Sequence, residues 1–111
     1  MKNRILAAET SKKVGENITV AGWVHSRRDH GGLIFIDLRD HTGLVQLVIN
    51  PDKKDAFSLA ESLRDEFVVR ACGVVAERGE GLKNPNIASG DVEIVVDNLE
   101  ILNRAETLPI Q

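Results

Sequence analysis

The fold is decided by residues 18–49, which run ITVAGWVHSRRDHGGLIFIDLRDHTGLVQLVI. Three segments of this stretch are rich in β-branched, aromatic and other apolar residues, and they predict strands over Ile18–Val24, Leu33–Arg39 and Leu44–Ile49. The segments are separated by Asp29–Gly32, which has two consecutive glycines, and by Asp40–Gly43, and both compositions are typical of turns. This part of the chain therefore predicts a meander of three strands.

Beyond Pro51 the apolar residues change to helical spacing. Asp52 is a candidate N-cap for the helix, and we place the helix end within Leu63–Phe67. The apolar residues that recur at helical spacing are Ala56, Phe57, Leu59, Ala60, Leu63 and Phe67. One amphipathic helix is therefore expected after the meander.

Two further strands follow the helix. Val68–Ala76 has the composition of a strand, and a glycine-containing loop over Arg78–Gly90 leads to Asp91–Leu102, in which apolar residues alternate with other side chains. Three strands, a helix and two strands is the order of an OB fold. We therefore predict an all-β domain with one helix, a five-stranded Greek-key OB-fold barrel whose second and third strands bind oligonucleotides in many proteins.

Length and composition predict one soluble domain. The chain has 111 residues, of which 42% are hydrophobic and 28% charged. We expect the domain to occupy residues 1–103 and residues 104–111 to begin a linker. Because no apolar run is long enough to span a bilayer and the N-terminus lacks the pattern of a secretory signal, we expect a cytoplasmic protein with no membrane partner.

The net charge of -3 argues against binding nucleic acid by bulk electrostatic attraction, so any such contact must come from a local patch. The single cysteine, Cys72, is expected to be buried as a small apolar residue. His25, His30 and His41 do not combine with it at the spacing of a metal site, and no catalytic motif is present. We therefore predict neither metal ligands nor catalytic residues in this chain.

An aromatic side chain lies on the polar face of the second predicted strand. Side chains alternate along a strand, so Phe35 shares its face with Asp37 and Arg39. A base of single-stranded nucleic acid can stack on such a ring with a gain of about 1 to 3 kcal/mol. Phe35 is therefore a candidate binding residue, and the alternative is that it packs under a loop.

Gln46 is the polar residue of the third strand. The inward set there is either Leu44 and Val48 or Val45, Leu47 and Ile49. Gln46 favours the second set, which turns its own side chain toward the solvent on the face of Phe35. Its amide could then read the edge of a base that Phe35 holds, and the alternative is a solvated glutamine with no such role.

Two adjacent arginines, Arg27 and Arg28, precede the first turn and are candidates for phosphate or base contacts. Neighbouring strand residues point to opposite faces, so only one arginine should share the face of Phe35, and the other should be a solvated partner of Asp37 or Asp40. Glu93, on the polar side of the last strand, could accept hydrogen bonds from N1 and N2 of a guanine. A surface carboxylate without that role is equally common.

The run Gly22–Asp40, continued by Gly43–Gln46, closely resembles the anticodon-binding domain of bacterial aspartyl-tRNA synthetases, and the resemblance extends over essentially the whole chain. It implies that the ligand is the anticodon loop of aspartate tRNA, whose three bases spread over the barrel. Phe35 would stack on the middle uracil, which Gln46 and Arg28 would hold. Glu93 would accept hydrogen bonds from the first-base guanine.

By the same resemblance, Arg78 and Asn84 would lie near the third base. Many family members that accept only aspartate tRNA have Leu at the position of His30. His30 and Gly81 together resemble the relaxed variety, so we hypothesise a domain that accepts asparagine tRNA as well. The alternative is a strictly discriminating domain in which these two loop positions vary neutrally.

The resemblance also implies a parent enzyme, aspartate-tRNA ligase, that uses ATP and Mg²⁺ on a separate class II catalytic domain. That enzyme would be a homodimer, whereas the fragment would be a monomer without cofactors or catalysis. Two other classes remain open from the residues alone: a general single-strand-binding OB module, and a barrel that binds only protein. The first would require several aromatics along the groove, and only Phe35 qualifies.

Overall fold

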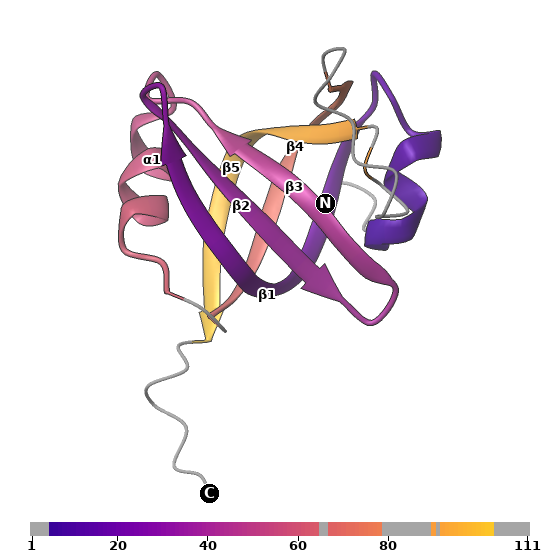
Figure 1. Ribbon diagram of the computed structural model, residues 1–111, viewed down its shortest axis with the longest axis horizontal. Coiled ribbons are helices and arrows are strands. Elements are labelled where there is room, and N and C mark those ends of the chain that lie inside the picture. Colours follow the sequence, from indigo (N-terminus) through magenta and orange to yellow (C-terminus); the bar gives the residue numbers. More distant parts are fainter. Residues whose placement is uncertain (1–4, 65–66, 79–89, 91, 104–111) are drawn as a thin grey trace, which may run out of the picture.

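In the computed structural model, which describes residues 5–64, 67–78, 90 and 92–103, five strands close into a barrel (Figure 1). The elements in chain order are a 3-10 helix (Ala7–Lys12), β1 (Asn17–His30), β2 (Leu33–Asp40), β3 (Gly43–Ile49), α1 (Lys54–Glu61), β4 (Val68–Glu77) and β5 (Val92–Asn103). The barrel order is β1-β2-β3-β5-β4, and β3 pairs with β5 in parallel while the other neighbours are antiparallel. The predicted five-stranded OB-fold barrel is confirmed.

The first strand, β1, pairs with two neighbouring strands. Its first half pairs with β4 and its second half with β2, and Trp23 takes part in both pairings. The register shifts between Val24 and Ser26, where the strand passes from one partner to the other. β1 extends to His30, so the predicted end at Val24 is wrong; the polar residues beyond it lack the composition of a strand but still pair with β2.

The helix is shorter than predicted. α1 ends at Glu61, and its N-cap is Lys53 without a side-chain hydrogen bond, so the predictions of Asp52 as the cap and of an end within Leu63–Phe67 are both wrong. Leu63 and Phe67 are nevertheless buried, and the Phe67 carbonyl accepts a hydrogen bond from the Val24 N–H at 2.8 Å. Their helical spacing therefore reflects burial in the core, since the chain turns back to β1 after Glu61.

The barrel interior is filled by alternating residues of the strands. These include Ile34, Ile36 and Leu38 of β2, Val45, Leu47 and Ile49 of β3, and Val92, Ile94 and Val96 of β5. The inward set predicted for β3 is therefore confirmed. α1 adds Ala56 and Ala60 to the core and lies on the opposite side of the barrel from the 3-10 helix (Figure 1).

The 3-10 helix is held to the barrel by Asp40, the last residue of β2. Its carboxylate accepts a hydrogen bond from the Ala7 N–H at 2.7 Å and two from Thr42, through the N–H at 2.8 Å and the hydroxyl at 2.6 Å. The Thr42 hydroxyl oxygen in turn accepts from the Ala8 N–H at 3.1 Å. Asp40 thus connects the N-terminal segment to the turn between β2 and β3.

We expect Asp40→Ala to lower the free energy of unfolding by about 1 to 3 kcal/mol at neutral pH, because the buried donors lose their acceptor. Denaturant unfolding at pH 7 measures the loss. The control is Asp97→Ala, since Asp97 forms an exposed ion pair with Lys53 whose removal costs about 0 to 1 kcal/mol. Equal losses in the two variants would contradict the anchoring role of Asp40.

The effect should depend on pH. Burial raises the pKa of Asp40, but hydrogen bonds from Thr42 and Ala7 outweigh it and bring the pKa below its ordinary value of 3.8. The folded protein therefore favours the charged carboxyl more than the unfolded chain does, and this stabilisation is complete above the ordinary pKa and lost as the pH falls through the lowered one. The stability difference between the original protein and Asp40→Ala should accordingly shrink in acid below pH 3.8.

Candidate nucleic-acid interface

A groove of about 590 Å³ lies where the polar faces of four strands meet. Its lining residues are Arg28, Asp29, His30, Phe35, Gln46, Arg78 and Glu93. Among the described residues, they include every predicted binding residue except Arg27. Asn84 and Gly81, the two remaining predicted positions, lie outside the described residues.

The strand register explains this convergence. Arg28 of β1 is the pairing partner of Phe35 in β2, and Gln46 of β3 pairs with Asp37 on one side and with Glu93 of β5 on the other. Because paired residues on neighbouring strands point to the same face, these side chains share one face in two adjacent rows, Arg28 with Phe35 and Asp37 with Gln46 and Glu93. The predicted common face of Phe35, Gln46 and Glu93 is therefore present.

Hydrogen bonds connect the two rows. Arg28 donates from Nη1 to Asp37 Oδ2 at 2.8 Å and from Nη2 to Gln46 Oε1 at 3.1 Å. Gln46 Nε2 donates to Glu93 Oε1 at 3.1 Å. Gln46 is only 9% exposed, so the expectation that it faces solvent is wrong: neighbours on both sides cover it.

The two arginines have different roles. Arg28 shares the face of Phe35 and also pairs with Asp37, a partner that the sequence prediction assigned to the other arginine. That prediction is wrong because Asp37 lies on the same outward face as Phe35. Arg27 instead pairs with Asp29 at 3.1 Å and donates to the carbonyl oxygens of Ala60 and Glu61 at the end of α1.

Electrostatics keep Asp37 ionised. Partial burial raises the pKa of Asp37, but hydrogen bonds from Arg28 and Ser26 outweigh it and leave the pKa below its ordinary value.

Arg78 occupies a more buried position than Arg28. It is 9% exposed, and its Nε donates a hydrogen bond to the Val92 carbonyl oxygen at 2.9 Å. The groove thus combines a half-buried ring with fixed cationic, amide and carboxylate groups.

This combination suits an unstacked base. The Phe35 ring offers a stacking surface, and Arg28, Gln46 and Glu93 offer donors and acceptors for base edges. Residues 18–102 match the family of tRNA anticodon OB-fold domains, described as an OB-fold nucleic acid binding domain. The chain belongs to this family.

The chain also resembles known proteins over its whole length. It is 53% identical over 112 residues to the aspartate--tRNA(Asp/Asn) ligase of Sulfurovum sp. (strain NBC37-1), covering 100% of this chain and 19% of that protein. Asparaginyl-tRNA synthetase from Pyrococcus horikoshii complexed with asparaginyl-adenylate is similar with a TM-score of 0.78 and 27% identity, over 100% of this chain and 25% of that one. The chain thus spans about a fifth to a quarter of the length of these two proteins.

A third similar structure is the OBody AM3L09 bound to hen egg-white lysozyme, with a TM-score of 0.77 and 25% identity. The match covers 94% of this chain and 97% of that one. That molecule consists almost entirely of the matched barrel. A barrel of this size therefore exists in a solved structure without a large additional domain in the same chain.

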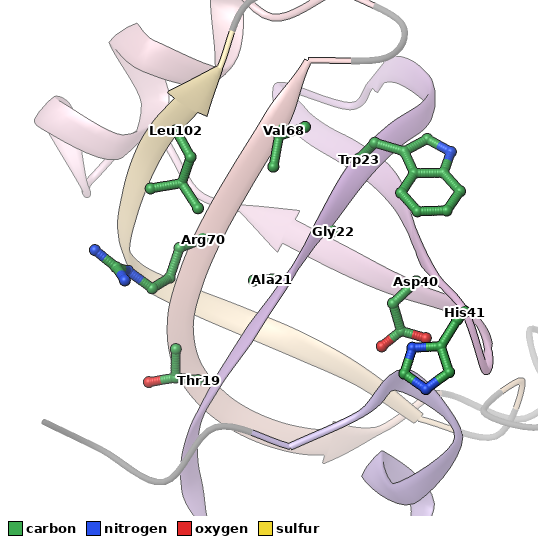
Figure 2. Close-up of a pocket in the computed structure, with 9 residues that line it drawn as sticks. All are labelled: Thr19, Ala21, Gly22, Trp23, Asp40, His41, Val68, Arg70 and Leu102. Carbon is green, nitrogen blue, oxygen red and sulfur yellow. The ribbon is translucent and has the colours of Figure 1, made fainter.

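A second hollow, of about 350 Å³, lies elsewhere on this OB-fold barrel, and none of the described residues lines both the hollow and the groove. Figure 2 shows Trp23 and Leu102 on either side of Val68, and Asp40 and His41 near Trp23. Trp23 is 39% and Leu102 45% exposed. The sequence prediction marked neither as a surface residue of interest, because apolar residues at strand positions are usually interpreted as core.

Cys72 lies outside both hollows and is half-buried rather than fully buried, with its sulfur 3.2 Å from the Thr19 hydroxyl. Among the residues that the structure describes, no group of three or more His, Cys, Asp and Glu could hold a metal ion. None of the helices in the described ranges has the length and apolarity that crossing a bilayer requires.

Proposed function

We propose that this chain binds the anticodon loop of aspartate tRNA, and that of asparagine tRNA as well, as the recognition domain of an aspartate-tRNA ligase. The observation that supports this most directly is the groove in which Phe35 lies beside the hydrogen-bonded side chains of Arg28, Gln46 and Glu93. The relative that acts on tRNA(Asp/Asn), 53% identical over the full chain, supports the choice of tRNA.

Each of the three anticodon bases has a proposed partner in this chain. The middle uracil stacks on Phe35 and bonds to Gln46 and Arg28, which together offer donors and an acceptor to its edge. The first-base guanine donates from N1 and N2 to Glu93, whose ionised carboxylate can only accept. We assign Arg78 and His30 of the groove to the third base, and the resemblance assigns Asn84 and Gly81 to the same base.

Relaxed reading of the third base follows from His30 and Gly81. Aspartate and asparagine anticodons differ only in this base, which is cytosine in the first and uracil in the second. His30 lines the groove at the end of β1, immediately before the turn to β2. A histidine there, together with a glycine in the loop after β4, tolerates both pyrimidines.

The whole protein would attach aspartate to tRNA on a class II catalytic domain that uses ATP and Mg²⁺. In this proposal residues 1–103 form the recognition domain and 104–111 begin the linker to the catalytic domain. The domain itself supplies orientation of the tRNA and no catalytic group. We further propose that the full enzyme is a cytoplasmic homodimer and that the isolated domain is a monomer.

Titration with anticodon stem-loops of identical stem tests the proposal at one stated salt concentration, because salt sets the phosphate contribution. Loops with GUC and GUU should bind within about threefold of each other, and a GAC loop should bind at least about tenfold more weakly, in the range of about 1 to 3 kcal/mol typical for the loss of a base contact. Equal binding of GAC would favour a general single-strand-binding module. A strong preference for GUC over GUU would refute relaxed specificity, and no binding of any loop would favour a barrel that binds only protein.

A further inference from the structure

Asp37 is a carboxylate beside the groove for which the proposed base contacts provide no role. It lies on β2 two residues from Phe35 and on the same face, and its side chain is 20% exposed, against 48% for Arg28. Bulk electrostatics would place no carboxylate there, because a negative charge beside an RNA site repels phosphates. Its position therefore calls for a specific function.

The contacts of Asp37 restrain Arg28. The guanidinium donates from Nη1 to Oδ2 at 2.8 Å and from Nη2 to Oδ1 at 3.5 Å, so both carboxylate oxygens face its fork. Ser26, the pairing partner of Asp37 on β1, donates to the same Oδ2 at 2.8 Å and fixes the carboxylate from the other side. An arginine held in this way has lost much of its rotamer freedom before a ligand arrives.

The restraint passes on to Gln46. The same Nη2 that faces Asp37 donates to Gln46 Oε1 at 3.1 Å, which turns Nε2 toward Glu93. The orientation of this amide decides whether a base edge meets a donor or an acceptor. Reversal of the amide would place Nε2 against the cationic guanidinium and Oε1 against the Glu93 carboxylate, and both contacts would be repulsive.

We propose that Asp37 is a positioning residue for base recognition: it holds the Arg28 guanidinium against Gln46 and thereby sets the orientation of the Gln46 amide. This inference rests on the proposed function and identifies a determinant of its selectivity for the middle base. Asp37 acts through Arg28 and makes no contact with the RNA itself.

The test compares two variants that remove the same charge. Asp37→Asn should lower the affinity for the GUC stem-loop about tenfold, although it makes the domain less negative, because Arg28 and Gln46 lose their fixed orientation. Asp97→Asn is the matched control, since it removes the same charge from a residue that pairs with Lys53 and does not line the groove. The affinity of this control variant for the GUC stem-loop should be unchanged or higher.

Two further measurements distinguish positioning from a general structural role. In an Arg28→Gln background, Asp37→Asn should change the affinity by less than about twofold, because coupled residues are not additive. Asp37→Asn should also reduce the ratio of affinities for loops with uracil and with cytosine at the middle position. Asp37→Glu, which retains the charge, should recover part of the affinity, and circular dichroism monitors the fold of each variant.

Affinity of Asp37→Asn equal to or above that of the original domain would overturn the inference, as would a full additive loss in the Arg28→Gln background. An equal loss for all loops with an unchanged uracil-to-cytosine ratio would also overturn it, because it would indicate a structural role only. The proposed function fails by a different result, namely an original domain that does not prefer the GUC loop over the GAC loop.

Discussion

Phe35→Ala is expected to weaken binding of the GUC stem-loop by about 5- to 150-fold, because stacking of a base on an aromatic ring contributes about 1 to 3 kcal/mol. Phe35 is half-buried on the outer face of β2, whereas its neighbours Ile34 and Ile36 point into the core. The fold should therefore persist. Fluorescence anisotropy with a labelled stem-loop measures the affinity, and thermal unfolding checks the barrel.

Two matched variants accompany this measurement. Phe35→Tyr retains an aromatic face and should bind within a few-fold of the original domain. Phe57→Ala removes the same side chain from α1, where it packs against the core, and should lower stability while affinity is retained in the folded protein. Undiminished binding by Phe35→Ala would remove the basis for anticodon recognition at this groove.

Gly73→Ala is expected to destabilise the barrel by about 1 to 3 kcal/mol or more, the range typical of overpacking. Gly73 lies in β4 where the register with β5 shifts, and an added Cβ would overlap the carbonyl oxygen of Val95. The obstacle is backbone, so rotation of a flexible side chain cannot relieve it. For a domain of this size the melting temperature should fall by roughly 5 to 20 °C.

Gly15→Ala provides the comparison for Gly73. Gly15 has a φ of 88° and nothing within 4 Å of an added Cβ, so the substitution incurs only the conformational penalty of about 1 kcal/mol. Differential scanning calorimetry of both variants separates steric overlap from backbone strain. A melting temperature of Gly73→Ala equal to or higher than that of Gly15→Ala would show that β4 and β5 can move apart here without loss of stability.

The barrel was predictable largely because β2, β4 and most of β5 alternate between core and surface. Val92, Ile94 and Val96 point inward as expected, and the same periodicity placed Phe35 and Glu93 on the polar face. The boundaries were less predictable where polar residues form strands or apolar residues form irregular chain. The second half of β1 is polar but pairs with β2 on both sides of the irregularity between Val24 and Ser26, and Leu63 has helical spacing but lies beyond the helix.

Contacts between side chains depend on register, which periodicity does not specify. The pairing of Arg28 with Asp37 follows from the β1–β2 register after the irregularity at Val24. The burial of Gln46 follows from the parallel pairing of β3 with β5, which two separate strand patterns cannot reveal. The sequence therefore predicted residues that the structure brings together in one groove, and the structure supplied the network that orients them.

The β3–β5 pairing also has a kinetic consequence. Gln46 and Glu93 are 47 residues apart in the chain, so their contact has high contact order and must await closure of a long loop. The β1–β2–β3 meander, by contrast, consists of local hairpins that can assemble early. We therefore expect that during synthesis on the ribosome the groove, and with it the proposed RNA binding, forms only after β5 emerges.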